Sequence, residues 1–432
     1  MSKHLYSPRL IKTERVIFYL QHYPMKFVIF GSHPALSLAE TYAVLGQTQI
    51  FSLLCPALAL LNTDQEIKKY QEQLGGIIKT GTVLWHLTRW DKNKIAMLIQ
   101  NSIKDVKGKE KISFGLSVYD AGAPDLAKQL IKEINRLGLT IKKELKTTGR
   151  PVRFVTSKEP TLSSVIIKTN KLLESGSEFV MMTTPEGVYI GQTETIQDWQ
   201  DWSERDFGRP LRNAKSGMLP PKVARMMINL ARQEAPISTL LDPFCGSGTI
   251  LMEAGMLGFK KIIGSDISPQ AITESTENFA WLKTHQPEKF GSETKLLISP
   301  AQDLDKKITD KIDAIVTEVY LGPPLKGGEN ESELQKNLAE LMTIYGQAFA
   351  TLSKMMNPAA MAVVAFPAFA YKGRTVSLPL KPMLEKIGLK IEEILPSSLK
   401  LPFVTISRSG GIIYSRPGQR VMREILVFKK ST

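Results

Sequence analysis

The second half of the chain alternates short apolar runs with segments in which apolar residues recur at helical spacing. From Leu219 onward we predict strands at 239–241, 261–264, 295–299, 314–317 and 361–366, with paired strands after Leu389. Helical periodicity fills the segments between them and predicts, for example, a helix at 249–257. Alternation of this kind favours a mostly parallel sheet covered by helices.

The first half is more mixed and predicts an α+β organisation. Strands are expected at 27–30, 49–54, 114–119, 152–156 and 179–183, and helices at 35–45, 64–74, 124–137 and 162–173. Residues 1–24 are polar and basic and are interpreted as an N-terminal extension. One α+β unit then ends near Trp85, and a second runs to residue 197. Residues 197–210 lack periodicity, so we predict a linker over 198–217 before an α/β domain at 218–432.

The sharpest motif follows the strand at 239–241 and reads Asp242-Pro243-Phe244-Cys245-Gly246-Ser247-Gly248-Thr249. Glycines at 246 and 248 let the backbone of this turn approach a ligand closely, and a helix begins directly after them. Open α/β sheets bind ligands at such carboxyl ends of strands. A glycine pair alone also suits an ordinary tight turn.

Two further acids follow neighbouring strands. Asp266 ends the strand that begins at Lys261, so its carboxylate can accept the hydroxyls of a ribose, with Ile267 beside it. The alternative is that Asp266 caps the helix beginning near Pro269. Asp303 follows the next strand and is a candidate for an adenine amine, although a helix N-cap is an equally good interpretation.

Charge points to a polyanionic partner, and by itself it leaves a nucleic acid and a membrane surface both open. The 432 residues contain 56 Lys and Arg against 42 Asp and Glu, which gives a net charge of +14. Residues 104–153 carry twelve Lys and Arg against six Asp and Glu, and they keep the periodicity of a folded domain. Arg150 and Arg153 are the best phosphate candidates because a guanidinium binds phosphate bidentately. Lys222 and Arg225 are further candidates for RNA contact, and a solvated face without RNA remains the alternative for all of them.

Composition also bounds the cellular setting. With 43% hydrophobic residues the chain can form two or three buried cores. The apolar run at 53–61 is too short to span a membrane and contains Pro56. Only Cys55 and Cys245 occur, which is typical of a reducing compartment, so we expect a cytoplasmic protein. The five histidines show no metal-ligand spacing, and we predict no metal site.

The ordered set of motifs resembles the THUMP-containing tRNA guanine-N2 methyltransferases that modify position 10. The segments that carry the resemblance are 160–165, 187–193, 205–210, 217–225, 242–249 and 414–420, and the match is nearly continuous from Met25 to Lys430. The resemblance implies a ferredoxin-like domain at 25–85, a THUMP RNA-binding domain at 86–197 and a Rossmann-like class I methyltransferase domain at 218–432. It implies S-adenosylmethionine as cofactor and tRNA as partner, with a small activator protein as a further candidate partner.

The residues that match the family's cofactor site are Asp242, Phe244, Gly246, Ser247, Gly248, Thr249, Asp266, Ile267 and Asp303. In this interpretation the glycines approach the methionine moiety, Asp266 the ribose and Asp303 the adenine. Methyl transfer from a sulfonium needs little acid or base assistance, so catalysis is expected to rest on positioning.

The expected amine-holding motif is altered. Enzymes that methylate exocyclic amines usually carry Asp/Asn-Pro-Pro-Tyr/Phe after the fourth strand, whereas this chain reads Glu318-Val319-Tyr320-Leu321-Gly322-Pro323-Pro324. We predict that Glu318 and the backbone at Val319 orient the guanine amine and that Tyr320 stacks on the flipped base. The alternatives are a strand-end carboxylate in a chain with changed activity, and a tyrosine that belongs to the core.

Two rival functions stay open. Adenine-N6 methylation of DNA uses the same kind of amine-holding motif, and the THUMP-like region argues against it. A non-catalytic RNA-binding protein that kept the fold would explain the altered motif.

Overall fold

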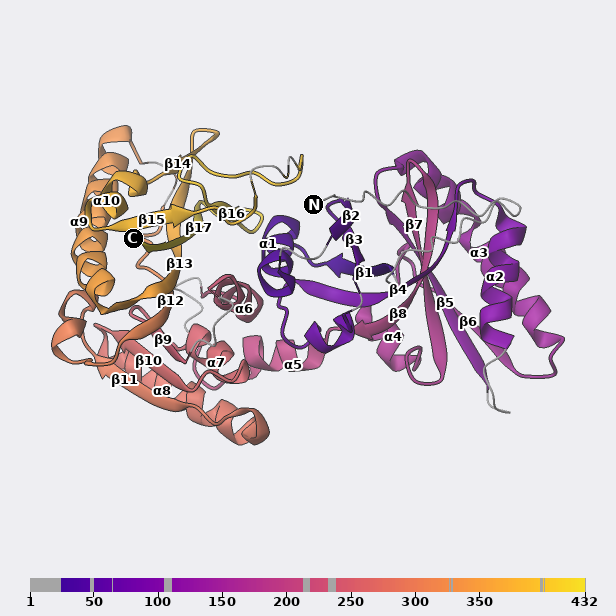
Figure 1. Ribbon diagram of the computed structural model, residues 1–432, viewed down its shortest axis with the longest axis horizontal. Coiled ribbons are helices and arrows are strands. Elements are labelled where there is room, and N and C mark those ends of the chain that lie inside the picture. The colour runs from indigo at the N-terminus through magenta and orange to yellow at the C-terminus, as the bar shows by residue number, and fades with distance from the viewer. Residues whose placement is uncertain are drawn as a thin grey trace, which may run out of the picture. The chain divides into compact units, whose positions relative to one another are not determined.

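The computed structural model describes residues 25–46, 50–63, 65–104, 111–212, 218–231, 238–325, 327, 329–396, 399 and 401–431. The predicted extension at 1–24 and residues 213–217 of the predicted linker lie outside this set. The chain forms two compact units (Figure 1). Unit 1 comprises Met1–Ser32, Gln47–Glu72 and Ile77–Trp199, and unit 2 comprises His33–Gly46, Gln73–Gly76 and Gln200–Thr432.

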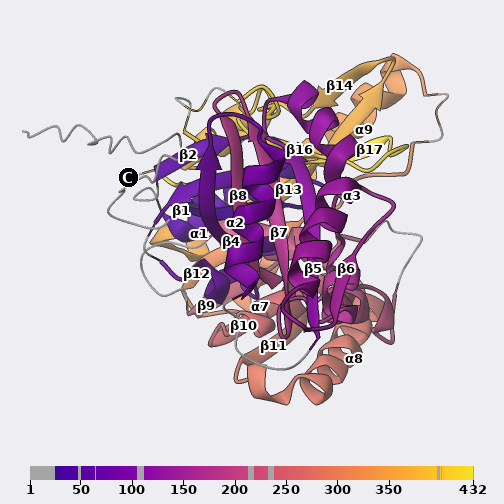
Figure 2. The ribbon, with the colours of Figure 1, turned by 90° about the vertical axis from the view of Figure 1, so that its right-hand side faces the viewer.

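Unit 1 is built on an eight-stranded sheet with the order β2-β3-β1-β4-β8-β7-β5-β6. Its strands are β1 (Met25–Phe30), β2 (Ile50–Leu54), β3 (Leu58–Asn62), β4 (Ile77–Leu87), β5 (Ile112–Asp120), β6 (Val152–Val155), β7 (Gly176–Thr184) and β8 (Gly187–Ile196). Only β5 has parallel partners, β6 and β7, among these pairs. The amphipathic helices α2 (Lys92–Lys104) and α3 (Pro124–Lys146) cover one face of the sheet (Figure 2).

A buried ion pair joins the central strands of unit 1. Lys79 Nζ on β4 lies 2.7 Å from Glu178 Oε1 on β7, and both side chains are inaccessible to solvent. The hydroxyls of Ser117 and Thr193 also donate to this carboxylate, and Lys79 donates to the carbonyl of Leu162. Each buried polar group therefore has a partner, which is the condition under which an internal charge pair is tolerated.

Unit 2 contains the predicted helix-covered, mostly parallel sheet, with the order β11-β10-β9-β12-β13-β17-β15. Strands β11 (Glu293–Ile298), β10 (Lys261–Asp266), β9 (Thr239–Asp242), β12 (Ile312–Glu318) and β13 (Met356–Tyr371) are parallel neighbours. Strands β17 (Val421–Lys430) and β15 (Leu389–Glu392) continue the sheet antiparallel, and β14 (Arg374–Ser377) and β16 (Ile412–Tyr414) pair at its side. The mixed α/β class with a Rossmann-like sheet is confirmed.

The helices of unit 2 in the described residues are α1 (Pro34–Leu45), α6 (Pro221–Leu230), α7 (Thr249–Met256), α8 (Pro269–His285), α9 (Glu331–Met355) and α10 (Leu380–Lys386), together with α5 (Trp199–Ser203), whose first residue is the last of unit 1. The long helix α9 begins with a capping box, in which Asn330 and Glu333 satisfy each other's backbone N–H groups. Leu334, Leu341 and Phe349 carry its apolar face into the main core of this unit.

Some predicted elements were wrong. The helix expected at 64–74 is only a 3₁₀ turn, Ile67–Tyr70, and the helix expected at 162–173 shortens to α4 (Ser164–Thr169). The irregular linker expected from 197–210 is instead α5 followed by a π-helical turn, Glu204–Gly208. The helical periodicity of this segment was missed because one of its buried residues is Arg205, and only apolar residues are expected to be buried in such a pattern.

Helix α1 belongs to unit 2, so the predicted domain at 25–85 is divided between the two units. Glu40 of α1 is fully buried and accepts the backbone N–H groups of Gly75 and Gly76 at 2.8 and 2.7 Å. Asn229 of α6 donates its Nδ2 amide to the same carboxylate at 2.6 Å. Burial raises the pKa of Glu40 to about 7. One carboxylate therefore joins three separate stretches of the chain.

Replacing Glu40 by alanine is expected to destabilise unit 2. The substitution leaves three buried donors without their acceptor, which costs about 2 to 4 kcal/mol in the free energy of unfolding. Urea denaturation followed by fluorescence measures the change. The control is Glu340→Ala, because Glu340 is exposed on α9, and a shift within about 0.5 kcal/mol is expected there. Equal stabilities of the two variants would contradict the role given to Glu40.

Candidate active site

The glycine-rich turn lies between the carboxyl end of β9 and the start of α7. Gly246 and Gly248 have φ angles of +50° and +86°, a region that side chains disfavour. A Cβ at Gly248 would lie 2.5 Å from Ser275 Oγ, so glycine is required there for packing. At Gly246 a Cβ would meet no atom within 4 Å, so the space over this residue is open.

Asp242 ends β9 beneath this turn. Its Oδ1 accepts the hydroxyl of Thr317 at 2.6 Å and the backbone N–H of Phe244 at 3.2 Å. Burial raises the pKa of Asp242 to about 7. Phe244 packs against the main core, so the predicted cofactor residues Asp242 and Phe244 also fix the turn from below.

Asp266 ends β10, the neighbour of β9, and its two carboxylate oxygens have different partners. Oδ2 accepts the N–H of Gly246 at 3.0 Å, and Oδ1 accepts the N–H of Ser268 at 2.9 Å. The N-cap of α8 is Ser268, whose hydroxyl accepts from Ala271, so Asp266 is not the cap itself. Asp266 instead connects the glycine turn to the tip of β10.

Two other predicted cofactor residues lie at the same edge of the sheet. The side chain of Ile267 is 72% exposed, an unusual position for a large apolar group directly after a buried strand. Asp303 lies in a 3₁₀ helix, Ala301–Lys306, where Pro300 occupies the N-cap position. The Asp303 carboxylate forms an ion pair with Lys306 at 2.5 Å. Asp303 is therefore not the N-cap of this helix, which was the alternative interpretation of the sequence.

The altered motif follows β12. Arg423 of β17 donates its Nε to Glu318 Oε1, and the side chain of Glu318 keeps 19% of its surface exposed. Burial raises the pKa of Glu318, and the Arg423 guanidinium opposes that rise. Val319 is buried, and its N–H donates to the carbonyl of Ala365 at 3.3 Å.

Tyr320 presents its ring outward, because 54% of the residue is exposed. Its backbone carbonyl accepts the hydroxyl of Tyr345 on α9, which holds the main chain at this point. The interpretation of Tyr320 as a core residue is therefore wrong.

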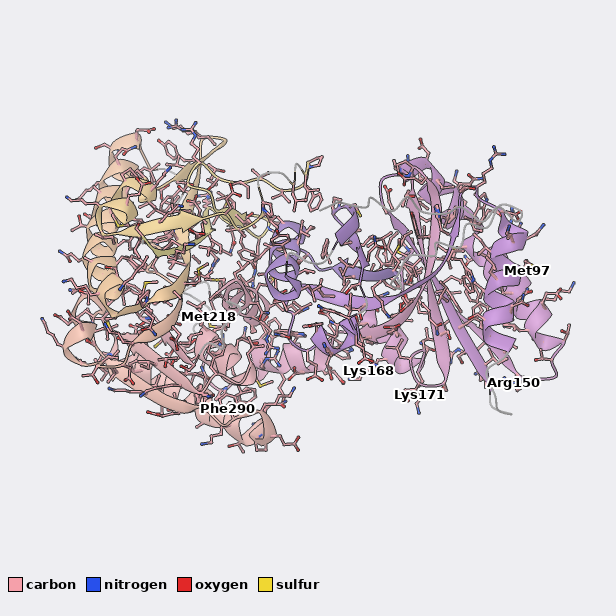
Figure 3. The ribbon with its side chains drawn as sticks, viewed as in Figure 1. Met97, Arg150, Lys168, Lys171, Met218 and Phe290 are labelled. Carbon is pink, nitrogen blue, oxygen red and sulfur yellow. The ribbon has the colours of Figure 1, made fainter. Side chains whose placement is uncertain are left out.

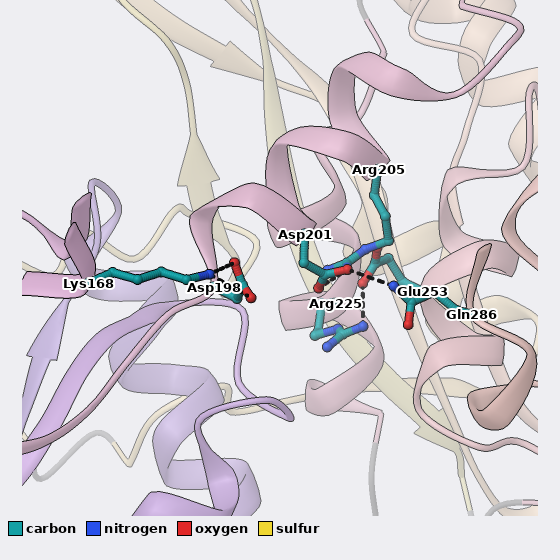
Figure 4. A network of polar contacts seen from close by, with 7 residues as sticks. All are labelled: Lys168, Asp198, Asp201, Arg205, Arg225, Glu253 and Gln286. Carbon is teal, nitrogen blue, oxygen red and sulfur yellow. Dashed lines mark hydrogen bonds and ion pairs between the residues drawn. The ribbon is translucent and has the colours of Figure 1, made fainter. Parts of the chain in front are cut away.

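A cluster of charged residues that the sequence did not reveal surrounds Glu253 of α7 (Figure 4). Arg205 Nε and Arg225 Nη2 each lie 2.7 Å from its carboxylate, and Arg205 also pairs with Asp201. The guanidinium carbons of Arg205 and Arg225 lie 4.2 and 4.9 Å from the centre of the Trp202 ring. The one available signal was the Asp201–Arg205 spacing of four residues, which suits a helical ion pair.

This cluster corrects one RNA-binding prediction. Arg225 is buried and paired with Glu253 inside unit 2, so its guanidinium is not exposed for contact with an RNA. Lys222 is partly buried, with its Nζ 5.5 Å from the centre of the Trp202 ring. Burial, reinforced by the charge of Arg205, lowers the pKa of Lys222 to about 8.

Residues 209–211 form hydrogen bonds with residues of α7 and α8 that flank the glycine turn. Arg209 donates its Nη1 to the hydroxyl of Thr249, the first residue of α7, at 2.7 Å. Asn278 of α8 bonds both backbone groups of Leu211 and the carbonyl of Ser247. The segment predicted to be a linker thus supports the predicted cofactor residues Ser247 and Thr249.

The predicted RNA contacts of unit 1 lie around the loop that joins α3 to β6. Arg150 is partly buried in this loop (Figure 3). Arg153 is exposed on β6, an edge strand of the sheet. The exposed side chains of Lys143 and Lys146 lie in the last turns of α3. Lys111 precedes β5, and the N–H of Ile112 bonds the carbonyl of Pro151. Basic residues distant in sequence therefore gather at one end of unit 1.

Two absences hold for the part of the chain that the structure describes. It contains no group of three or more His, Cys, Asp or Glu side chains placed to hold a metal ion. None of its helices has both the length and the apolar character needed to cross a membrane.

Two family models match this chain. One, described as "RMKL-like, methyltransferase domain", matches residues 209–367, and the other, described as "DNA methylase", matches residues 62–277. Among solved structures, TrmN from Thermus thermophilus is similar with a TM-score of 0.51 and 16% identity, over 94% of this chain and 99% of that chain. At 16% identity, the similarity to TrmN is a similarity of fold.

Curated relatives match shorter stretches. The tRNA (guanine(10)-N2)-dimethyltransferase of Methanothermobacter thermautotrophicus is 35% identical over 118 residues, which are 27% of this chain and 32% of the relative. A protein of Methanothermococcus thermolithotrophicus named "Probable tRNA (guanine(10)-N2)-dimethyltransferase" is 31% identical over 138 residues, 32% of this chain and 82% of the relative. The chain spans about a third or less of the length of the first relatives it matches.

The raised pKa of Asp242 predicts a pH-dependent stability. The unfolded chain releases this proton near pH 3.8 and the native chain near pH 7, so the unfolding free energy falls as the pH rises between these values. Asp242→Asn keeps an acceptor for Thr317 and Phe244 but does not titrate. In urea denaturation between pH 4 and 8, the wild type should therefore lose stability relative to Asp242→Asn as the pH rises to about 7. A difference between them that stays constant over this range would show that Asp242 is ionised throughout.

Proposed function

Because this chain belongs to the methyltransferase family that includes the tRNA (guanine(10)-N2)-dimethyltransferases, we propose that it transfers a methyl group from S-adenosylmethionine to the exocyclic amine of guanine in tRNA, at position 10. The observation that carries the proposal is one edge of the parallel sheet in unit 2. The glycine turn follows β9, and Asp266 and Glu318 are the last residues of β10 and β12, so all three lie at the carboxyl ends of adjacent strands.

The residues of this edge fit the proposed cofactor. The open space over Gly246 leaves room for the methionine part against the backbone of the turn. Asp266 offers carboxylate lone pairs beyond those that its two N–H donors use, and ribose hydroxyls are suitable donors to them. The exposed apolar surface of Ile267 is suited to contact an adenine ring. The Asp303 carboxylate is proposed to accept a hydrogen bond from the adenine amine, which would compete with Lys306 for this carboxylate.

The chain's own residues then position the base. When bound, the cofactor supplies a methyl group on a sulfonium, which leaves as a neutral thioether. Glu318 is held by Arg423 through Oε1, so Oε2 is the oxygen proposed to accept an N–H of the guanine amine. The carbonyl of Val319 is proposed as the second acceptor, and the exposed ring of Tyr320 as the stacking surface for the extruded base. Orientation of the amine toward the methyl group is the main catalytic contribution expected here.

Residues 25–85, of which 33–46 and 73–76 belong to unit 2, are proposed as a ferredoxin-like domain, and residues 86–197 of unit 1 as a THUMP domain that binds the tRNA. Support comes from the basic residues that gather where α3 ends and β5 and β6 begin. Arg153 is exposed there on a short edge strand, with Arg150 beside it. Phosphate contacts of this kind position an RNA without reading its sequence.

A second candidate function is methylation of an adenine amine in DNA. The match of residues 62–277 to a model described as DNA methylase favours it. The deciding experiment is a single-turnover assay with labelled cofactor on three substrates: a tRNA transcript with guanine at position 10, the same transcript without that guanine, and duplex DNA. Methyl transfer only to the first transcript supports the proposal. Methyl transfer only to DNA contradicts it and supports the second candidate function. No transfer to any substrate would favour the non-catalytic interpretation.

Removing the Asp266 carboxylate is expected to weaken cofactor binding. Asp266→Ala should lose about 1.5 to 3 kcal/mol of binding free energy, roughly ten- to a hundredfold in Kd, because the ribose loses a charged acceptor and the turn loses its bond to Gly246. Isothermal titration calorimetry gives the affinity. Ser268→Ala is the matched control, since it removes the cap of α8 and keeps Asp266. If both variants bind the cofactor like the wild type, Asp266 does not contact it.

Substitutions in the altered motif separate catalysis from binding. Glu318→Ala should slow single-turnover methyl transfer about a hundredfold, equivalent to about 2.7 kcal/mol, while Glu318→Gln retains one acceptor and part of the rate. Tyr320→Phe should be tolerated and Tyr320→Ala impaired, because stacking uses the ring. Cofactor affinity should stay unchanged in all four variants. Full activity of Glu318→Ala would assign the amine to another residue.

A further inference from the structure

One segment near the altered motif has a charge pattern that the proposed function does not use. The thirty residues from Ile394 to Arg423 contain five Lys and Arg and no Asp or Glu. Arg423 pairs with Glu318, whereas Arg416 and Arg420 are exposed, and among the described residues the structure places no carboxylate within ion-pair distance of either. Cations concentrated without acids favour an anionic ligand from outside the chain.

Arg416 and Arg420 lie at the two ends of a well-defined turn between β16 and β17. The N–H of Gln419 donates to the carbonyl of Arg416 at 3.1 Å, and the N–H of Arg416 donates to Gln419 Oε1 at 2.9 Å. Gly418 has a φ of +80°, which closes the turn. The backbone of this turn therefore satisfies its own hydrogen bonds and holds both arginines in place.

The guanidinium of Arg416 is oriented for a bidentate contact. Its Nε donates to the hydroxyl of Tyr414 at 3.1 Å. The Tyr414 ring packs against His33, with ring centres 4.4 Å apart, so the acceptor itself is fixed. Arg416 is exposed, and its two terminal nitrogens have no ion-pair partner among the described residues, so they are suited to a bidentate contact with a phosphate.

The turn is close to the proposed base site. A Cβ on Gly327, in the loop that follows Tyr320, would lie 1.6 Å from Arg420 Nη1, so Arg420 lies directly against that loop. Three residues farther along β17, Arg423 reaches Glu318, and Arg423 pairs in register with Tyr414 of β16. The arginine turn and the amine-orienting carboxylate are thus connected by one short stretch of strand.

We propose that the turn Ser415–Arg420 binds the RNA backbone phosphates that flank the methylated guanine. The inference rests on the proposed function and adds a substrate contact to the same site. An extruded nucleotide is held at its base by stacking and hydrogen bonds, but its backbone also has to be fixed in the rotated position. Arg416 and Arg420 supply two cations on a rigid turn for that purpose, and their contacts are independent of base sequence.

The test compares two double variants that each remove two positive charges. Arg416→Ala/Arg420→Ala changes the turn, and Lys260→Ala/Lys311→Ala removes exposed lysines that precede β10 and β12, at the opposite edge of the sheet from Glu318. Kd for the tRNA transcript is measured between 50 and 300 mM salt, together with the single-turnover rate. The turn variant should bind about tenfold or more weakly, and its slope of log K against log salt should decrease by about 0.7 to 0.9 for each phosphate lost. The lysine variant should change Kd less than threefold.

Further measurements keep the outcomes separate. Unchanged cofactor affinity and thermal unfolding show that the turn variant is folded, and Arg416→Lys/Arg420→Lys should recover the salt slope but only part of the affinity. Equal tRNA binding by the two double variants would overturn the phosphate site. A wild type that binds tRNA but methylates no guanine would overturn the proposed function, while the salt slopes still decide the phosphate site. A wild type that does not bind tRNA would overturn both.

Discussion

The candidate site depends on the hydrogen bond between the Thr317 hydroxyl and the Asp242 carboxylate. This 2.6 Å bond is buried and joins the carboxyl ends of the neighbouring strands β9 and β12. The glycine turn follows Asp242, and Glu318 follows Thr317, so the bond fixes the cofactor side and the base side of the site against each other. Glu318 is in turn held by Arg423, which extends the same chain of contacts to β17. Because the interior is desolvated, each of these polar groups is stable only with its partner present.

A second buried network involves α7, the helix that follows the glycine turn. Glu253 of α7 pairs with Arg205 and Arg225, and Arg209 donates to Thr249, which lies about one helical turn before Glu253. Burial lowers the pKa of Arg225 and of Lys222, and the neighbouring positive charge of Arg205 lowers both further. Such a cluster is a poor source of net stability, but it fixes the orientation of α7 because few other arrangements satisfy the same charges. The orientation of α7 matters for the site, since this helix begins directly after the glycine turn.

The parts of the site that follow a strand were predictable from the sequence. Asp242, Gly246 and Asp266 come at the ends of short apolar runs, and parallel strands bring such positions to one edge of the sheet. Arg205, Arg225 and Glu40 were not predictable, because a charged residue is expected at the surface and only tertiary contacts show its burial. The assignment of α1 to unit 2 had the same cause, since its apolar pattern says that a face is buried but not against which part of the chain. The long α3 was underestimated because Gly138 interrupts its pattern, although in the structure that glycine makes room for the Phe154 ring.

The place of α1 in unit 2 has a consequence for synthesis on the ribosome. Glu40 and its partner Asn229 are 189 residues apart in sequence, and most of unit 1 lies between them. At about 5 to 20 residues per second, translation separates the appearance of these two side chains by about 10 to 40 s. During that interval α1 has left the ribosome, and the Glu40 carboxylate has Gly75 and Gly76 as partners but not yet Asn229 of α6. Unit 2 is therefore a discontinuous domain whose first helix is synthesised before most of unit 1 and whose sheet is synthesised after it, so α1 reaches its native place only when translation is well advanced.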